Sequence, residues 1–218
     1  MRTLIIAGGE PVSNDILKAI TRLADTIICA DSGADVLYSH QIAVPDTVIG
    51  DFDSILPDAA SFFEAAGVEC IRVDNQQTTD LEKAILLALK RGSDIIDITC
   101  ITGGRGDHYL NALSALIKWR DSARMRLIDD WDEVTLRNES FTEKSRPGER
   151  ISLIPFGVKK VTDVTTTGLV YPLEGIDLET GKLESISNMA EGESFSVSFT
   201  SGILLLFRPA SSVLFNEI

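Results

Sequence analysis

The sequence predicts a chain of two domains, an α/β domain with a mostly parallel sheet followed by an all-β sandwich. Up to about residue 122, short β-branched runs alternate with longer stretches of helical period, which is typical of parallel βα units. After about residue 124 the helical period disappears, and strand-like runs are separated by Gly, Pro, Asn and acidic turns. We therefore expect the domains to span residues 1–123 and 124–218.

The expected elements of the first domain alternate between strand and helix. The strands are Leu4–Ala7, Thr26–Ala30, Thr47–Ile49, Cys70–Val73 and Ile95–Ile101. The helices between and after them are Ser13–Ala24, Ala34–His40, Pro57–Ala66, Leu81–Lys90 and Tyr109–Arg120. In the second domain we expect strands at Met125–Ile128, Glu133–Leu136, Arg150–Ile154, Ser194–Phe199 and Ile203–Phe207. The apolar residues of 81–90 recur at helical spacing, so that helix is expected to pack one face on the sheet.

The composition and charge of the chain disfavour nucleic acid and anionic membranes as partners. The chain has 33 acidic and 20 basic residues and a formal net charge of -13, which repels nucleic acid and anionic membrane surfaces. Cys29, Cys70 and Cys100 show no paired spacing, so we expect them to be buried, reduced thiols. No apolar run approaches about 18 residues, and a cytoplasmic location is expected.

Two carboxylates one residue apart follow the third expected strand, in Ile49-Gly50-Asp51-Phe52-Asp53-Ser54. Residues i and i+2 of an extended backbone point to the same side, so Asp51 and Asp53 can converge on one cation. Asp and Gly are also ordinary turn residues. The hexapeptide alone therefore leaves a solvated turn equally open.

The other polar clusters of the first domain also fall at the carboxyl ends of expected strands, where open parallel sheets bind ligands. That edge would gather Asp31, Asp51, Asp53, Asp80, Arg105, Asp107 and His108. Carboxylates brought together would repel one another unless a divalent ion joined them, which implies a metal, and Mg²⁺ suits aspartates from separate loops. Arg105, flanked by glycines, is placed to hold phosphate oxygens. The set predicts phosphoryl or pyrophosphoryl transfer from a nucleotide.

Simpler interpretations stay open for single residues. Asp31 before Ser32-Gly33 is also a suitable helix cap, and Thr79-Asp80 followed by Glu82 is also an ordinary helix start. The sequence has neither a G-x-x-x-x-G-K-[ST] loop nor a G-x-G-x-x-G loop, which disfavours a P-loop kinase.

Taken together, the motifs closely resemble those of the thiamin pyrophosphokinase family, in order and over nearly the whole chain. In the first half they are Ala30-Asp31-Ser32-Gly33-Ala34, Gly50-Asp51-Phe52-Asp53-Ser54, Thr79-Asp80 and Gly103-Gly104-Arg105-Gly106-Asp107-His108. In the second half they are Val164-Thr165-Thr166-Thr167-Gly168-Leu169, Tyr171-Pro172-Leu173 and Ser185-Ile186-Ser187-Asn188.

The resemblance implies a homodimer that transfers the diphosphate group of ATP to the hydroxyl of thiamin, giving thiamin diphosphate and AMP. It implies an ATP- and magnesium-binding catalytic first domain and a second domain that binds thiamin and dimerises. Asp31, Asp51, Asp53 and Asp80 would hold magnesium and the triphosphate, and the ATP contacts would be Gln76, Thr79, Arg105, Asp107 and His108. Ser187 and Asn188 would contact thiamin. Catalysis would rest on Asp51, Asp53, Asp80 and Arg105, with Asp51 or Asp53 accepting the hydroxyl proton.

Three departures from the family pattern leave alternatives open. Gln77 stands where many members have an acid, and the Asn of the segment after His108 comes one place early, as Asn111. The run 203–207 lacks the Trp that stacks on thiamin in eukaryotic members. A magnesium-dependent nucleotide diphosphohydrolase, or a non-catalytic nucleotide or thiamin sensor, would use the same residues.

Overall fold

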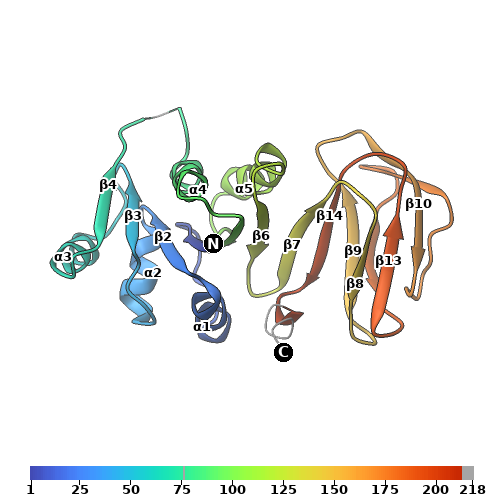
Figure 1. Ribbon diagram of the computed structural model, residues 1–218, viewed down its shortest axis with the longest axis horizontal. Helices are drawn as coiled ribbons and strands as arrows, with labels where there is room; N and C mark the ends of the chain where they lie inside the picture. Colours follow the sequence, from blue (N-terminus) through green and yellow to red (C-terminus); the bar gives the residue numbers. More distant parts are fainter. Residues whose placement is uncertain (76, 213–218) are drawn as a thin grey trace. The chain divides into compact units, whose positions relative to one another are not determined.

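The computed structural model describes residues 1–75 and 77–212 (Figure 1). The described chain forms two compact units, Met1–Trp131 and Asp132–Ser212. Each unit has its own buried core.

The first unit is built on a parallel sheet in the order β6-β5-β1-β2-β3-β4. Its strands are β1 (Arg2–Ile6), β2 (Thr26–Ala30), β3 (Thr47–Gly50), β4 (Glu69–Arg72), β5 (Ile95–Thr99) and β6 (Arg124–Ile128). The strand order reverses between β1 and β5, because β1 to β4 run outward in one direction and the chain then returns to the other side of β1. The carboxyl ends on either side of such a reversal bound the crevice in which open parallel sheets bind ligands.

Helices cover both faces of this sheet. They are α1 (Asn14–Leu23), α2 (Gly33–His40), α3 (Pro57–Ala65), α4 (Asp80–Lys90) and α5 (Gly106–Lys118). Right-handed crossovers place α1, α2 and α3 on one face, and the change of direction after β4 places α4 and α5 on the other, as Figure 1 shows. Helix α4 packs across β1, β2 and β3.

The beginning of α2 lies close to the end of β1. A side chain at Gly33 would collide with the carbonyl oxygen of Ile6, so only glycine allows this approach. The loop after β2 is thereby held against the loop after β1 at the edge where the expected ligand site lies.

The predicted βα order is confirmed, with three differences. β6 belongs to the first unit, because it pairs in parallel with β5, so the expected boundary after residue 123 falls one strand too early. Helix α5 begins at Gly106 rather than Tyr109, which puts Asp107 and His108 in its first turn. Cys70 is exposed, not buried, because it lies on the edge strand β4.

The second unit is an antiparallel sandwich, as predicted. One sheet has the order β12-β9-β14-β7 and the other β11-β10-β13-β8. Its elements are β7 (Asp132–Arg137), β8 (Phe141–Lys144), β9 (Arg150–Pro155), β10 (Lys160–Thr167), β11 (Ile176–Glu179), β12 (Ser185–Met189), β13 (Ser194–Ser198), β14 (Leu204–Pro209) and the short helix η1 (Ala210–Ser212). Side chains from both sheets form the core, among them Ile151, Leu153, Val161, Phe195 and Leu206. Residues 213–218 of the expected second domain lie outside the described residues.

Among the described residues, no helix is both long enough and apolar enough to cross a membrane. The cytoplasmic location stays a prediction.

Candidate active site

A large cavity of the first unit opens at the carboxyl ends of the parallel strands. It has a volume of about 1050 Å³. Each of the loops that follow β1, β2, β3 and β5 contributes to its wall, together with the first turns of α4 and α5. Of the predicted site residues, those that line it are Asp31, Asp51, Thr79, Asp80, Arg105 and His108.

Three carboxylates meet in this cavity. Asp31, Asp51 and Asp80 each offer one oxygen, and the three oxygens lie within 4.8 Å of one another. Asp31 is only 4% exposed and has a left-handed backbone with φ of 45°. Its Oδ2 accepts a hydrogen bond from the hydroxyl of Ser54. Its Oδ1 is buried and has no hydrogen-bond partner within residues 1–75 and 77–212.

A divalent cation fits this arrangement. A buried carboxylate oxygen without a partner is costly, and a bound cation would satisfy it. Oxygen ligands from separate loops suit Mg²⁺, which keeps several waters and binds through a few carboxylates. Gly50 allows the close approach, because a side chain there would lie 2.8 Å from Cβ of Asp31. Asp31, Asp51 and Asp80 are thus the residues that could hold the metal.

Asp53 lies outside this group of three carboxylates. Strand β3 ends at Gly50, and Phe52 has a left-handed φ of 64°, so the alternation of an extended strand does not continue to Asp53. The backbone N–H of Asp53 donates to Oδ1 of Asp51 over 3.3 Å. The charge of Asp51 is the main cause that raises the pKa of Asp53, with smaller contributions from Asp31 and Asp80.

The first turn of α4 brings a positively charged side chain, that of Lys83, to the three carboxylates. Thr79 caps the helix in a capping box with Glu82, so the simpler interpretation of this segment is correct, and Thr79 and Asp80 line the cavity as well. Nζ of Lys83 lies 2.8 Å from Oδ1 of Asp80, and the Lys83 side chain is only 6% exposed. Sequence reasoning missed Lys83, although its i,i+3 spacing from Asp80 was a usable signal.

The start of α5 carries a second positively charged side chain, that of Arg105. Arg105 makes a two-point contact with Asp107, with 2.6 Å from Nη2 to Oδ2 and 3.2 Å from Nε to Oδ1. The hydrogen bond from Arg105 is the main cause that lowers the pKa of Asp107. Arg105 and His108 line the cavity, whereas Asp107 is not in its wall. Since both members of the pair are exposed, the guanidinium is accessible to an anion.

The remaining predicted residues lie elsewhere. Gln76 is outside the described residues, while its neighbour Gln77 lines the cavity. Ser187 and Asn188 lie on β12 of the second unit. The amide of Asn188 holds the backbone of Tyr171, because Nδ2 donates to the Tyr171 carbonyl oxygen over 2.7 Å and Oδ1 accepts from the Tyr171 N–H over 3.0 Å. Asn188 therefore fixes the loop before β11 against β12.

Exposed apolar side chains lie beside the contact between Asn188 and Tyr171. Tyr171 and Ile186 are each 64% exposed, and Val170 and Met189 are also exposed. Groups of exposed apolar side chains are typical of surfaces that bind a ligand or another chain.

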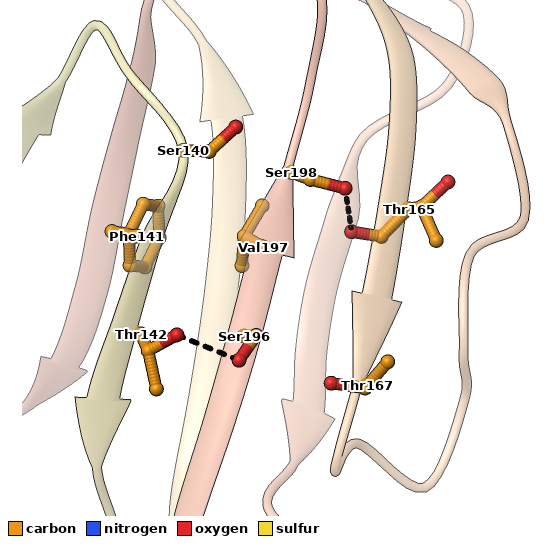
Figure 2. A pocket seen from close by; sticks show the side chains of 8 residues that line it. All are labelled: Ser140, Phe141, Thr142, Thr165, Thr167, Ser196, Val197 and Ser198. Atoms are coloured by element: carbon orange, nitrogen blue, oxygen red, sulfur yellow. Dashed lines mark hydrogen bonds between the residues drawn. The ribbon is translucent and has the colours of Figure 1, made fainter.

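The second unit also has a groove on the sheet formed by β8, β13 and β10, shown in Figure 2. It has a volume of about 290 Å³, and hydroxyl side chains dominate its wall. Thr142 and Ser196 bond to each other over 2.8 Å, and Ser198 donates to the carbonyl oxygen of Thr165. The residues that line the groove carry no charge, and its hydroxyls are partly engaged with one another, so it offers little to an anionic or cationic ligand.

Comparisons with known families cover both units. The family model described as thiamin pyrophosphokinase, catalytic domain, matches residues 17–128, and the one described as thiamin pyrophosphokinase, vitamin B1 binding domain, matches residues 139–204. Thiamine pyrophosphokinase of Bacillus subtilis (strain 168) is 33% identical over 216 residues, which are 95% of this chain and 99% of that protein.

Solved structures agree with the fold. The crystal structure of thiamine pyrophosphokinase from Bacillus subtilis has a TM-score of 0.84 at 30% identity and covers 96% of this chain and 99% of its own. Thiamin pyrophosphokinase from Candida albicans has a TM-score of 0.85 at 21% identity, covering 95% of this chain and 88% of its own, and at that identity it shows the fold alone. The predicted succession of an α/β domain and a β-sandwich is confirmed.

Proposed function

We propose that this chain, which belongs to the thiamin pyrophosphokinase family, transfers the diphosphate group of ATP to the hydroxyl of thiamin and releases AMP. The observation that carries the proposal is the cavity of the first unit, where three converging carboxylates face a wall that also holds Arg105 and Lys83. Such a wall suits a triphosphate that arrives with a divalent cation.

Asp31, Asp51 and Asp80 would hold the cation, which we propose to be Mg²⁺. When bound, it neutralises phosphate charge and polarises the phosphate oxygens. Asp53 is close enough for its pKa to respond to the cluster, so we propose that it contributes to the same site through water or substrate.

The cationic side chains would bind the phosphate chain. Arg105 offers a planar set of donors that matches phosphate oxygens, and Lys83 offers a point charge beside Asp80. Breaking the contact between Arg105 and Asp107 costs little, because both side chains are exposed. As the family pattern implies, Gln76, Thr79, Asp107 and His108 would contact the nucleotide, and of these Thr79 and His108 line the cavity.

Transfer needs the thiamin hydroxyl in line with the β-phosphorus and an acceptor for its proton. The transition state of phosphoryl transfer is loose, so positioning and charge neutralisation carry most of the rate. We propose Asp53 as the proton acceptor in preference to Asp51, because the carboxylate of Asp51 belongs to the cluster of three and that of Asp53 does not.

We propose that the second unit binds thiamin and joins two copies of the chain. The support is the match of residues 139–204 to the vitamin B1 binding model and the exposed apolar side chains beside Ser187 and Asn188. In this proposal Asn188 acts by fixing Tyr171, since its amide already bonds that residue's backbone at both ends.

One assay tests the activity and separates it from the alternatives. The purified chain is incubated with ATP and MgCl₂, with and without thiamin, and AMP and thiamin diphosphate are measured. Thiamin-dependent AMP release with an equal amount of thiamin diphosphate is expected. AMP release that does not require thiamin would identify a nucleotide diphosphohydrolase, and binding of both ligands without turnover would identify a sensor.

A further inference from the structure

A half-buried amide in the cavity has a fixed orientation and, among the residues that the structure describes, a donor without an acceptor. Asn111 lies on α5, one turn after His108, and both side chains are in the cavity wall with Arg105. The departure from the family pattern is what puts an amide there, because position 112 is the buried Ala112, which is 1% exposed.

Thr79 fixes which way the amide faces. The Thr79 hydroxyl accepts from the backbone N–H of Glu82 over 3.3 Å, and it donates to Oδ1 of Asn111 over 3.2 Å. A hydroxyl has one proton to donate. If the amide were reversed, that proton would have no acceptor in the part of the chain that the structure describes. Oδ1 of Asn111 therefore faces Thr79, and Nδ2 faces away from it.

Two further hydrogen bonds surround this contact. Glu82 closes the capping box by accepting from the Thr79 N–H, and its other carboxylate oxygen accepts from Nζ of Lys118 over 2.8 Å. Lys118 lies on α5, so the start of α4 and the length of α5 are tied together at two points. The tie connects Asp80, which directly follows Thr79, to the helix that carries Asn111.

The amide nitrogen of Asn111 is left with two protons and, within residues 1–75 and 77–212, no acceptor. Phosphate oxygens only accept hydrogen bonds, so a neutral donor here is complementary to the ligand that the neighbouring residues favour. We infer that Nδ2 of Asn111 donates to a phosphate oxygen of the bound nucleotide and that Thr79 holds it in the donating orientation. The inference rests on the proposed function for the identity of the ligand.

Asn111→Asp is the sharpest test. The aspartate keeps the shape and still accepts from Thr79, but it replaces the donor with a second carboxylate oxygen. Losing a hydrogen bond to a charged group should weaken ATP binding by about tenfold to a hundredfold, and repulsion adds to the loss. Asn111→Ala, which removes the donor without adding charge, should show the smaller effect. Ser114→Ala, one turn further along α5 at an exposed position outside the cavity wall, is the matched control and should bind ATP like the wild type.

ATP affinity is measured by titration calorimetry in MgCl₂ without thiamin, and thermal unfolding shows whether each variant is folded. In turnover assays the KM for ATP should rise in both Asn111 variants, while the KM for thiamin stays unchanged. Wild-type ATP affinity in folded Asn111→Asp and Asn111→Ala would overturn the inference, as would the absence of ATP binding by the wild-type chain. ATP binding by the wild type without thiamin turnover would overturn the proposed activity alone, since the comparison of affinities still stands.

Discussion

Replacing Asp51 with Asn should stabilise the first unit in the absence of divalent cations. One oxygen each of Asp31, Asp51 and Asp80 lies within 4.8 Å of the others, and two unit charges at that distance repel by about 3 kcal/mol at an effective dielectric constant of about 20. The substitution removes the two pairwise repulsions that involve position 51. Because Asp51 and Asp80 are partly exposed and Lys83 offsets one charge, we expect about 1 to 2 kcal/mol of this to appear in the free energy of unfolding.

Thermal unfolding followed by circular dichroism checks this prediction. In EDTA, Tm of the variant should be about 2 to 8 °C above that of the wild type. In MgCl₂ the order should change, because a cation at a hundred times its Kd adds about 2.7 kcal/mol to the wild type, and the variant should lose most of that gain. Asp53→Asn, the same substitution outside the cluster of three, should keep most of the magnesium-dependent rise. A lower Tm for Asp51→Asn in EDTA, or an undiminished response to magnesium, would refute the reasoning.

Three further predictions concern charge and thiol chemistry. Lys83→Met removes a positive charge beside the carboxylates, so titration calorimetry should show that the variant binds Mn²⁺ more tightly than the wild type. The same substitution removes a positive charge that would bind phosphate, so ATP should bind about tenfold more weakly. Weaker Mn²⁺ binding by the variant would contradict this prediction. The charge of Asp51 raises the pKa of Asp53, so the folded chain holds that proton more tightly, and in EDTA the contribution of Asp53 to stability is lost as pH rises above about 4. Asp53→Asn lacks this contribution, so its Tm should fall less, or rise more, than that of the wild type as pH rises through that range. Ellman's reagent should react rapidly with Cys70 alone in the native chain and with all three thiols after denaturation, and three rapid thiols in the native chain would exclude the burial described.

The sequence predicts the first unit well because its central strands are buried on both faces. Leu4, Ile5 and Ile6 are fully buried, so β1 is a continuous apolar run that periodicity detects. Strand β10 was missed because one of its faces is exposed and carries Thr side chains. It also contains Asp163, whose φ of 58° marks a break in register with β11. A polar face and an irregular register remove the signals on which a strand prediction depends.

The site, too, has residues that the sequence predicted and residues that it did not. Asp31 and Asp51 were predictable because the end of a parallel strand fixes where the next residue lies. Lys83 was not identified and Asn111 was noted only as a departure from the family pattern, because whether a helical residue reaches the cavity depends on the rotation of the helix against the sheet. Sequence spacing shows that two positions share a face, but it does not show which face meets the ligand.

The overall charge of the chain explains why ATP should bind together with the divalent cation. At a formal net charge of -13 the chain repels free ATP at long range. Inside the cavity, the three ionised carboxylates, one divalent cation and Lys83 together carry no net charge. Arg105 and the neutral donor of Asn111 can then bind phosphate oxygens without a competing excess of negative charge. ATP binding should therefore depend steeply on the divalent cation, and Asn111→Asp would restore the repulsion that the cation removes.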